Sequence, residues 1–271
     1  MTEGQVDAGR PIRVVLFCGG PTLDRAVVRF VARLESQPEI DFVAGFCETQ
    51  AQTMAAVFRD RLRRRGVLGL GLLLVEAVRG LQRWMAHPFN ELALWNSRAR
   101  LAKQIHSVAD LHAESTLERV RSLNPDLGLI YGGPILKPRL FQIPRLGTVG
   151  IHHGKMPGYR GKKTTFWAMY NGDETAGVTI QRVNAGIDTG QIIRRGEVRI
   201  EGRSVGQVTR ELEERGFDLY VQAIIDLKRG TAQSVPGWGV KGKLYKDPKL
   251  GDFVRFWWRR KLPRRGHVAS N

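Results

Sequence analysis

GTVGIHHGKMPGYRGKKTTFWAMYNGDETAGVTIQRVNAGIDTG, residues 147–190, is the stretch that decides the fold of this chain. A short apolar run at 148–151 predicts a strand, and a polar loop rich in Gly and Pro follows it. A helical segment at 165–170 and a second apolar strand at 177–183 come next. A tight Asn-Ala-Gly turn then leads to Asp188. This order of elements is typical of an α/β sheet.

The preceding part of the chain alternates strands and helices in the same way. Residues 12–17 read as a β-rich strand, 22–35 as a helix with apolar positions at helical spacing, and 41–46 as a second strand. A capping box at Ser204 opens a long helix, for which Gly230 supplies a stop. Further strand-like runs lie at 105–108, 126–131 and 191–200, and a further helix at 115–123. The pattern predicts a Rossmann-like α/β fold with a mainly parallel central sheet flanked by helices.

His152 and Asp188 are the candidate catalytic residues. Each follows a predicted strand, and open α/β sheets place their chemistry at the carboxyl ends of their strands. We therefore expect the two side chains to meet over one cleft at that edge. The alternative is that His152 is a hydrogen-bonded structural residue. A metal site is not expected, because the contiguous His152 and His153 would point poorly at one ion.

The same stretch carries a pattern of residues that resembles a known superfamily. The matching positions are His152, Pro157, Tyr159-Arg160-Gly161, Trp167-Ala168, Asn171-Gly172-Asp173, Gly177-Val178-Thr179 and Gly186-Ile187-Asp188-Thr189-Gly190. The pattern is similar to that of the 10-formyltetrahydrofolate-dependent formyltransferases, which include methionyl-tRNA, glycinamide ribonucleotide and amino-sugar N-formyltransferases. The resemblance is collinear over residues 11–230. It implies transfer of a formyl group from 10-formyltetrahydrofolate to an amine, with His152 stabilising the oxyanion and Asp188 supporting His152 and managing proton transfer.

The resemblance also implies a set of cofactor-binding residues. Ile135 and Leu136 correspond to an Ile-Leu pair in the hydrophobic pocket for the pterin ring. Asn184, Ala185 and Ile187, in the turn before the candidate Asp, are assigned to the cofactor as well. From the residues alone, Ile135 and Leu136 would simply be core.

Gly150 is the main departure from the family pattern. The family has Asn-x-His where this chain has Gly150-Ile151-His152, so a hydrogen-bond donor to the oxyanion is missing. Loss of one such donor typically lowers the rate by about 10²- to 10³-fold. The ring of the neighbouring His153 is a hypothetical replacement donor.

The composition is strongly basic, with a formal net charge of +17. That charge favours an anionic partner, namely nucleic acid, acidic lipid or a phosphorylated substrate, although a solvated basic surface is the simpler alternative. Only Cys18 and Cys47 are present, which indicates a reducing, cytoplasmic compartment. The first residues are polar and show no signal peptide. No uncharged run reaches the length that a membrane span needs.

Two segments fall outside the family pattern. Residues 50–103 contain a basic cluster beside an apolar run, and they read either as a helical insertion packed on the sheet or as a helix lying on an anionic membrane. Residues 253–265 interleave Phe and Trp with Lys and Arg, which suits a membrane interface, single-stranded nucleic acid, or a short helix buried on the domain. We expect a catalytic domain at 1–230 and a C-terminal extension at 231–271.

The function that these observations favour is formyl transfer to an amine. Methionyl-tRNA formyltransferases continue into a C-terminal barrel domain, and the extension at 231–271 is expected to be too short to form a full one. The expected acceptor is therefore an amino sugar, linked to a nucleotide or a lipid, or another small amine. A folate-binding protein with impaired catalysis, a formyl-donor hydrolase and a methionyl-tRNA formyltransferase-like enzyme are the alternatives. The protein is expected to be cytoplasmic, with peripheral contact to the membrane as one option. Its oligomeric state is not indicated.

Overall fold

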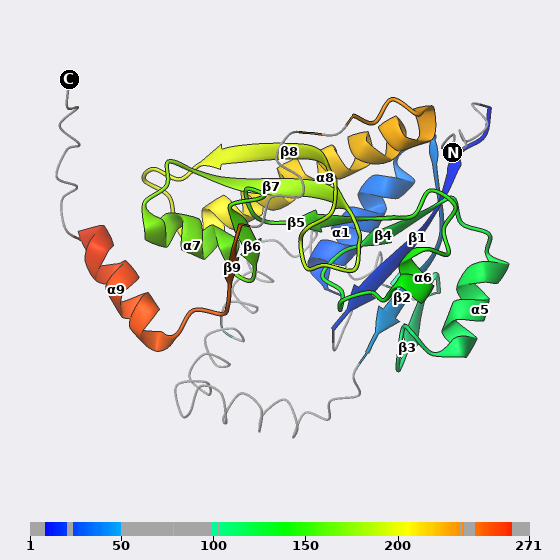
Figure 1. Ribbon diagram of the computed structural model, residues 1–271, viewed down its shortest axis with the longest axis horizontal. Coiled ribbons are helices and arrows are strands. Elements are labelled where there is room, and N and C mark those ends of the chain that lie inside the picture. The colour runs from blue at the N-terminus through cyan, green and yellow to red at the C-terminus, as the bar shows by residue number, and fades with distance from the viewer. Residues whose placement is uncertain are drawn as a thin grey trace.

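A central seven-stranded sheet organises the molecule (Figure 1). The computed structural model describes residues 9–20, 24–49, 78, 99–101, 103–233, 235 and 242–261. The strands of the sheet are β1 (Ile12–Gly19), β2 (Ile40–Glu48), β3 (Ile105–Val108), β4 (Leu127–Ile130), β5 (Thr148–His152), β7 (Thr175–Arg182) and β8 (Ile192–Arg199). Their order is β3-β2-β1-β4-β5-β7-β8. The five strands from β3 to β5 are parallel, while β7 and β8 are antiparallel to their neighbours. The expected Rossmann-like, mainly parallel fold is confirmed.

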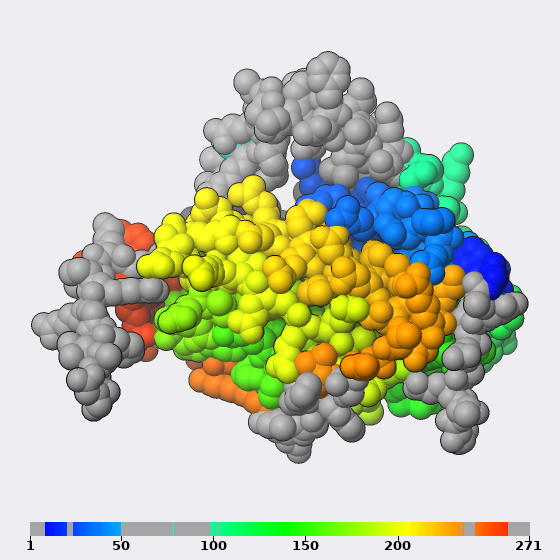
Figure 2. Space-filling view, turned by 90° about the horizontal axis from the view of Figure 1, so that it is seen from above, coloured from blue at the N-terminus to red at the C-terminus, as the bar shows by residue number. Residues whose placement is uncertain are grey.

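Helices cover both faces of this sheet. The helices α1 (Arg25–Glu35) and α8 (Val205–Arg229) lie side by side on one face, as Figures 1 and 2 show. On the other face lie α5 (Glu114–Ser122) and α6 (Pro138–Phe141). The strand β1 serves both layers, because Val14 and Leu16 join the core under α1 and α8 while Val15 and Phe17 join the core under α5. A strand buried on both faces is why 14–17 reads as a continuous apolar run.

The ends of the long helices follow the capping signals in the sequence. The Asp24 side chain accepts a hydrogen bond from the Ala26 amide at the start of α1. At the start of α8, Ser204 and Gln207 form the reciprocal pair of bonds of a capping box, as the sequence predicts. Gly230 ends α8 with a φ of 68°, a left-handed conformation that glycine adopts without strain.

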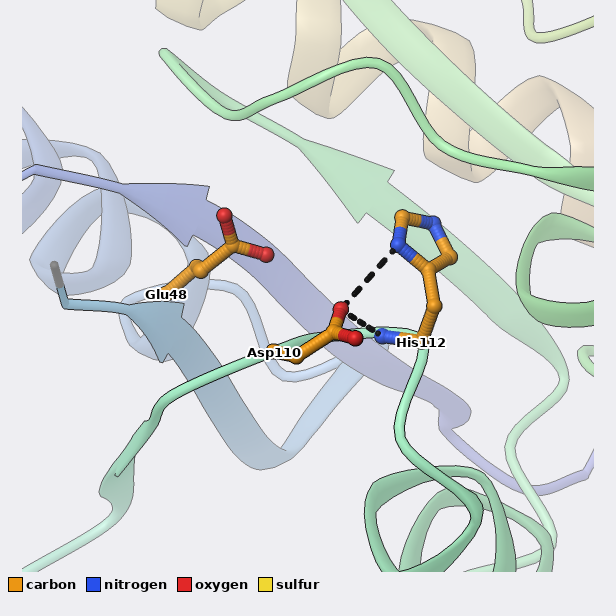
Figure 3. Close-up of side chains that lie close together, drawn as sticks. All are labelled: Glu48, Asp110 and His112. Carbon is orange, nitrogen blue, oxygen red and sulfur yellow. Dashed lines mark hydrogen bonds and ion pairs between the residues drawn. The ribbon is translucent and has the colours of Figure 1, made fainter.

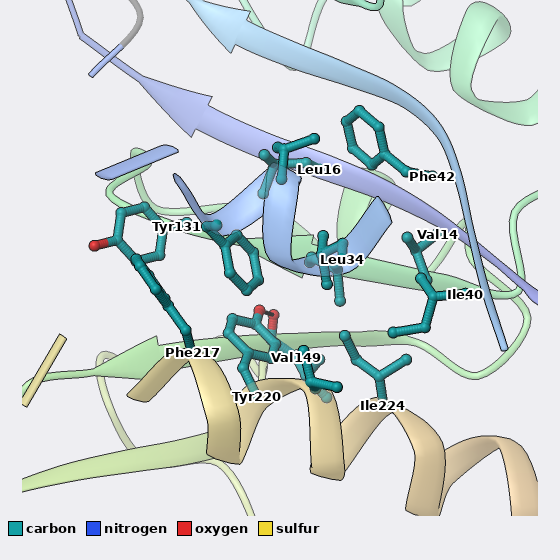
Figure 4. Packing of buried hydrophobic residues seen from close by; sticks show 14 of the residues in the cluster. Val14, Leu16, Leu34, Ile40, Phe42, Tyr131, Val149, Phe217, Tyr220 and Ile224 are labelled. Carbon is teal, nitrogen blue, oxygen red and sulfur yellow. Dashed lines mark hydrogen bonds between the residues drawn. The ribbon is translucent and has the colours of Figure 1, made fainter. Parts of the chain in front are cut away.

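Tyr220 ties α8 to the middle of the sheet (Figure 4). Its ring is fully buried and stacks on Phe30 of α1, with ring centroids 4.8 Å apart. The hydroxyl donates to the Val149 carbonyl at 2.7 Å and accepts from the Ile130 amide at 3.1 Å. It therefore links β4 to β5 just before the two strands reach their carboxyl ends.

A second, two-stranded sheet joins the C-terminal extension to the domain. Its strands β6 (Tyr159–Gly161) and β9 (Lys243–Tyr245) run parallel. The Tyr159 and Tyr245 rings stack, with centroids 5.1 Å apart and planes within 10°. The helix α7 (Thr164–Asn171) supports this contact, because the Trp167 indole donates to the Lys246 carbonyl. Sequence periodicity could not reveal three-residue strands that pair across such a distance along the chain.

The last described helix, α9 (Leu250–Lys261), packs on α7 at the outer end of the molecule (Figure 1). Its Phe253 and Phe256 rings lie 4.9 and 5.0 Å from the Phe166 ring, centroid to centroid. The Arg259 guanidinium lies over the Tyr170 ring at 4.9 Å. The expected tail is therefore helical, and part of its aromatic content is packed on the domain.

Some sequence predictions lie outside the described residues. They include nearly all of the expected helical insertion at 50–103, the loop residues 21–23, and 262–271 at the end of the basic tail. In the described part of the chain, none of the helices combines the length and apolarity required to span a bilayer.

Candidate active site

His152 ends β5 and is almost completely buried, with 8% of its surface exposed. Its Nε2 lies 2.8 Å from the Tyr159 carbonyl oxygen, and its Nδ1 lies 3.5 Å from Asp188 Oδ1. Both ring nitrogens thus face oxygen acceptors, and only a doubly protonated imidazole can donate to both. The structure places the two candidate catalytic side chains in contact.

The route by which Asp188 reaches His152 differs from the one expected. We expected both residues at a shared carboxyl edge, but β7 is antiparallel to β5, and its last residue, Arg182, pairs with Val149 at the beginning of β5. The carboxyl end of β7 therefore lies at the opposite edge. The loop 183–190 folds back along the sheet and returns Asp188 to the end of β5. The path of the chain between β5 and β7 makes β7 antiparallel to β5, and the sequence pattern did not show this path.

This loop is held by specific hydrogen bonds. Asn184 Oδ1 accepts from the Gly186 amide and the Thr189 hydroxyl, both at 3.0 Å, which closes the turn on itself. The Arg160 guanidinium donates to the Ile187 carbonyl at 2.7 Å. Asp188 has a φ of 49°, a left-handed conformation that Asp tolerates better than most residues. The result is a braced loop that delivers one carboxylate to a fixed place.

The Asp188 carboxylate has three neighbours. Oδ2 accepts from the Gly161 amide at 2.9 Å, and Oδ1 accepts from the Gln181 side-chain amide at 3.2 Å and faces the His152 ring. Gly161 belongs to β6, so the small second sheet takes part in positioning the carboxylate. Gln181 was not singled out from the sequence.

A cavity of about 1020 Å³ opens beside this pair. Four of the five residues assigned to the cofactor line it: Ile135, Leu136, Asn184 and Ile187. Ile135 is 66% exposed, so it is not a core residue. Leu136 is 3% exposed and packs mainly in the core under α5. Ala185 is exposed and is not among the residues that line the cavity. Its assignment to the cofactor stays a prediction.

The C-terminal extension supplies a wall of this cavity that the sequence pattern did not reveal. Residues 244–247, brought there by β9, line it together with Gly161, Lys162 and Lys163 at the end of β6. The rim is cationic on balance: Lys162, Lys163, Arg182 and Lys246 belong to the lining, as does Asp247, which pairs with Lys162 at 3.2 Å. Such a rim is suited to an anionic group at the mouth of the cavity.

Gly150 has no room for a side chain in this structure. It lies in β5 on the cavity wall, and a Cβ placed on it would be 2.6 Å from Ile130 Cγ2 of the neighbouring strand. That distance is shorter than real Cβ contacts, so the Ile130 side chain already fills the space. The Ile130 side chain can therefore occupy this space only because position 150 is a glycine.

His153 does not take the donor role considered for it. Its ring meets the Tyr131 ring edge-on, at 6.5 Å between centroids, and it is not one of the residues that line the cavity. Burial, together with the neighbouring His152, lowers its pKa from 6.5 to about 4. Its Nε2 has no hydrogen-bond partner among the described residues. His153 is thus a neutral packing residue at neutral pH.

One group of side chains in the described part of the chain has the spacing of a metal site: Glu48, Asp110 and His112 (Figure 3). It lies apart from the cavity lining. His112 Nε2 accepts the Lys137 amide at 3.0 Å, so the ring proton is on Nδ1, which faces Asp110 Oδ1 at 3.4 Å. Glu48 Oε2 accepts the Leu111 amide. Neither ring nitrogen has a lone pair free for an ion, and the group fixes the turn before α5.

The sequence of the chain matches a family at the part that builds this site. Residues 93–224 match the family described as formyl transferase. This part of the chain, about half of its length, is similar to formyl transferases. A methionyl-tRNA formyltransferase of a Cyanothece species is 33% identical over 179 residues, which are 65% of this chain and 48% of that protein. The chain spans about a third to a half of the length of the curated relatives that it matches.

Solved structures share the fold at lower sequence identity. A 4-N formyltransferase from Francisella tularensis has a TM-score of 0.57 at 14% identity, over 92% of this chain and 87% of that one. HypX from Aquifex aeolicus, solved in complex with tetrahydrofolic acid, has a TM-score of 0.55 at 14% identity, over 89% of this chain and 30% of that one. At these identities, the likeness establishes the formyltransferase fold.

Proposed function

We propose that this chain transfers a formyl group from 10-formyltetrahydrofolate to an amine. The observation that carries the proposal is the contact of 3.5 Å between His152 and Asp188 at the wall of a large cavity. The similarity to formyl transferases and the tetrahydrofolic acid bound to HypX support the donor.

The residues of the cavity fit a folate. Ile135 and Ile187 offer exposed apolar surface for a flat ring, and both are more than 40% exposed without a ligand. Gly132, Gly133 and Gly186 also line the cavity, and without side chains their main-chain groups can provide polar contacts. The cationic rim suits the carboxylates of the glutamate portion. Bound 10-formyltetrahydrofolate would supply the formyl carbon that the amine attacks.

His152 would stabilise the negative charge that develops on the formyl oxygen. Nε2–H donates to the Tyr159 carbonyl. The Nδ1 contact with Asp188, at 3.5 Å, is long for a hydrogen bond, so Nδ1–H is the donor that can turn to the formyl oxygen. The Asp188 carboxylate faces the ring and can accept the proton that the attacking amine loses. Hydrogen bonds from Gly161 and Gln181 hold that carboxylate in place.

An amino sugar carried on a nucleotide or a lipid is the acceptor that we favour. A diphosphate at the mouth of the cavity would meet the cations of the rim, including Lys162 and Lys246. The sequence relatives favour a second candidate, methionyl-tRNA, since they are methionyl-tRNA formyltransferases. Water as acceptor would make the protein a formyl-donor hydrolase with the same residues.

Incubation with 10-formyltetrahydrofolate and a panel of acceptors tests the proposal. The panel consists of a nucleotide-linked 4-amino sugar, glycinamide ribonucleotide, hydroxyornithine, methionyl-tRNA and water alone. Tetrahydrofolate release and product mass are measured. Formylation of the amino sugar at the highest rate is expected. Tight binding of tetrahydrofolate without turnover on any acceptor would instead indicate a folate-binding protein.

We also propose that α9 brings the protein to an anionic membrane surface. Four large apolar residues of this helix are about half or more exposed: Leu250 at 67%, Val254 at 48%, Trp257 at 50% and Trp258 at 58%. Phe253 and Phe256 of the same helix contact the Phe166 ring of α7, although Phe253 is still 47% exposed. At 100° per residue the first four of these residues share one side of the helix, with Arg255 beside them. Exposed Trp flanked by cations is typical of interfacial helices.

A further inference from the structure

Gln181 has a hydrogen-bonding capacity that the described protein does not use. It is 7% exposed and belongs to the cavity lining. Its Nε2 donates to Asp188 Oδ1 at 3.2 Å, but its Oε1 is buried and has no partner among the described residues. The orientation of this amide is settled by Asp188, because a flipped amide would set its oxygen against a carboxylate oxygen. Oε1 is therefore a fixed acceptor that lacks a donor.

The register of the sheet places this acceptor beside the catalytic pair. Gln181 is directly opposite Gly150, and Thr179 is directly opposite His152, in the antiparallel pair of β5 and β7. Residues opposite one another, and residues two apart, project on the same face. The Gln181 carboxamide thus lies on the same face as the His152 ring. Gly150 itself contributes no side chain there, and the Ile130 side chain of β4 fills the space next to it.

We propose that Gln181 Oε1 accepts an N–H of the attacking amine, an inference that rests on the proposed formyl transfer. A neutral primary amine has two N–H groups and one lone pair. With one N–H on Gln181 Oε1 and the other on the Asp188 carboxylate, the lone pair is directed away from both, toward the formyl carbon. The Gln181 carboxamide is hydrogen-bonded to Asp188, the carboxylate that receives the amine proton. This proximity favours a contact with the amine over one with the folate. Gln181 forms no covalent bond in this role.

Replacing Gln181 with Met tests the assignment, because Met has nearly the same size and no oxygen. The wild type and Gln181→Met are compared by steady-state kinetics with the amine of the panel that is turned over fastest, by calorimetric titration with tetrahydrofolate, and by the Tm of the unliganded protein. We expect the KM for the amine to rise at least 10-fold. The Kd for tetrahydrofolate should stay within about 2-fold.

The Tm gives a second readout, because a structural role for Gln181 predicts that the Tm falls. Removal of the unpaired buried carbonyl stabilises the empty protein, while loss of the hydrogen bond from Nε2 to Asp188 Oδ1 opposes this gain, so the Tm should stay close to that of the wild type. Gln104→Met is the matched control, since Gln104 Oε1 is also buried without a partner among the described residues, but it does not line the cavity. This control should behave like Gln181→Met in Tm and like the wild type in kinetics.

Three outcomes would overturn the assignment. An unchanged KM in an active Gln181→Met enzyme means that no amine N–H meets Oε1. A rise in the Kd for tetrahydrofolate with the amine KM unchanged means that the N–H donated to Oε1 belongs to the folate. A Tm that falls well below that of Gln104→Met shows that Gln181 serves the fold. By contrast, a wild type that transfers formyl to no amine refutes the proposed function itself, and the amine contact with it.

Discussion

Asp188 shows how a single residue can combine an unusual backbone conformation with a reactive position. Its left-handed φ of 49° turns its carboxylate toward the Gly161 amide and the His152 ring. Backbone conformations of this kind persist where the surrounding structure fixes them, and here the loop 183–190 does so. The carboxylate is therefore preorganised rather than recruited by a ligand.

Asp188→Asn should lower turnover by about 10²-fold and leave the Kd for tetrahydrofolate nearly unchanged. The amide keeps an oxygen for the Gly161 N–H but removes the carboxylate that faces His152 and can accept the amine proton. Single-turnover kinetics and calorimetry measure the two effects. Asp247→Asn, at the cavity rim, removes a charge of the same sign and should have a much smaller effect on turnover. Wild-type turnover in Asp188→Asn would contradict the role given to this carboxylate.

Gly150→Asn should not by itself restore the family pattern. The new Cβ would collide with Ile130 Cγ2, so we expect a loss of stability of about 1–3 kcal/mol from overpacking. Ile130→Ala combined with Gly150→Asn removes the obstruction and should recover part of that stability and raise turnover. Urea unfolding and kinetics on the two single variants and the double variant measure the coupling. Additive effects would show that the two side chains do not compete for the same space.

His153 should make stability depend on pH in a defined window. Its folded-state pKa, about 4, is below the ordinary value of 6.5. Between these values the unfolded chain takes up a proton that the folded protein excludes, so stability falls as the pH drops from 6.5 to 4. The loss is at most about 3 kcal/mol. His153→Phe keeps the ring against Tyr131 and removes the titration, so its stability profile should be flatter in that window. Parallel profiles for the two proteins would refute the buried, neutral state.

At the scale of elements, sequence periodicity located the strands and helices well but not their directions. The apolar runs at 12–17 and 41–46 and the capping box at Ser204 each correspond to an element whose ends differ by only a few residues. Local spacing determines those features. The reversal of β7, and the pairing of β6 with β9, depend on how the chain connects in space, which no local pattern records.

The sequence likewise pointed to some residues of the candidate site and not to others. His152 and Asp188 stand out because the motif around them is dense and specific. Gln181 does not stand out, because a Gln in an apolar strand gives no signal until its register against Gly150 is known. Lys246 belongs to a segment that resembles nothing in the family pattern, so its place at the cavity required the structure.

Tyr220→Phe tests the link between α8 and the sheet. The variant keeps the buried ring and leaves the Val149 carbonyl without the hydroxyl donor, so we expect a loss of about 1–3 kcal/mol in the free energy of unfolding. Tyr170→Phe, whose ring lies under the Arg259 guanidinium, is the control and should lose much less. Equal losses would mean that the hydroxyl of Tyr220 contributes nothing specific.

For the whole molecule, the net charge of +17 and the exposed face of α9 predict binding to vesicles. Flotation should occur with acidic lipids at low salt and weaken as the Debye length shortens from about 10 Å at 0.1 M to about 3 Å at 1 M. Replacing Trp257 and Trp258 with Ser should reduce it strongly. The double variant Arg255→Gln, Arg259→Gln should bind acidic vesicles less than the control Arg119→Gln, Arg121→Gln. The control arginines lie on α5, far from α9 (Figure 1).

Two results would argue against this surface. Equal recovery with neutral and acidic vesicles removes the electrostatic part of the proposal. Capture of the protein by a soluble partner in place of vesicles would assign the exposed Trp face to a protein contact.

The wall that β9 adds to the cavity has a consequence for the order in which the protein acquires its site during synthesis. His152 and Asp188 leave the ribosome early, together with the strands that carry them, and they can come into contact while the chain is still growing. Residues 244–247 follow only after the whole of α8 has been made. In a chain made from its N-terminus, the wall that residues 244–247 add is therefore the last part of the cavity to be synthesised.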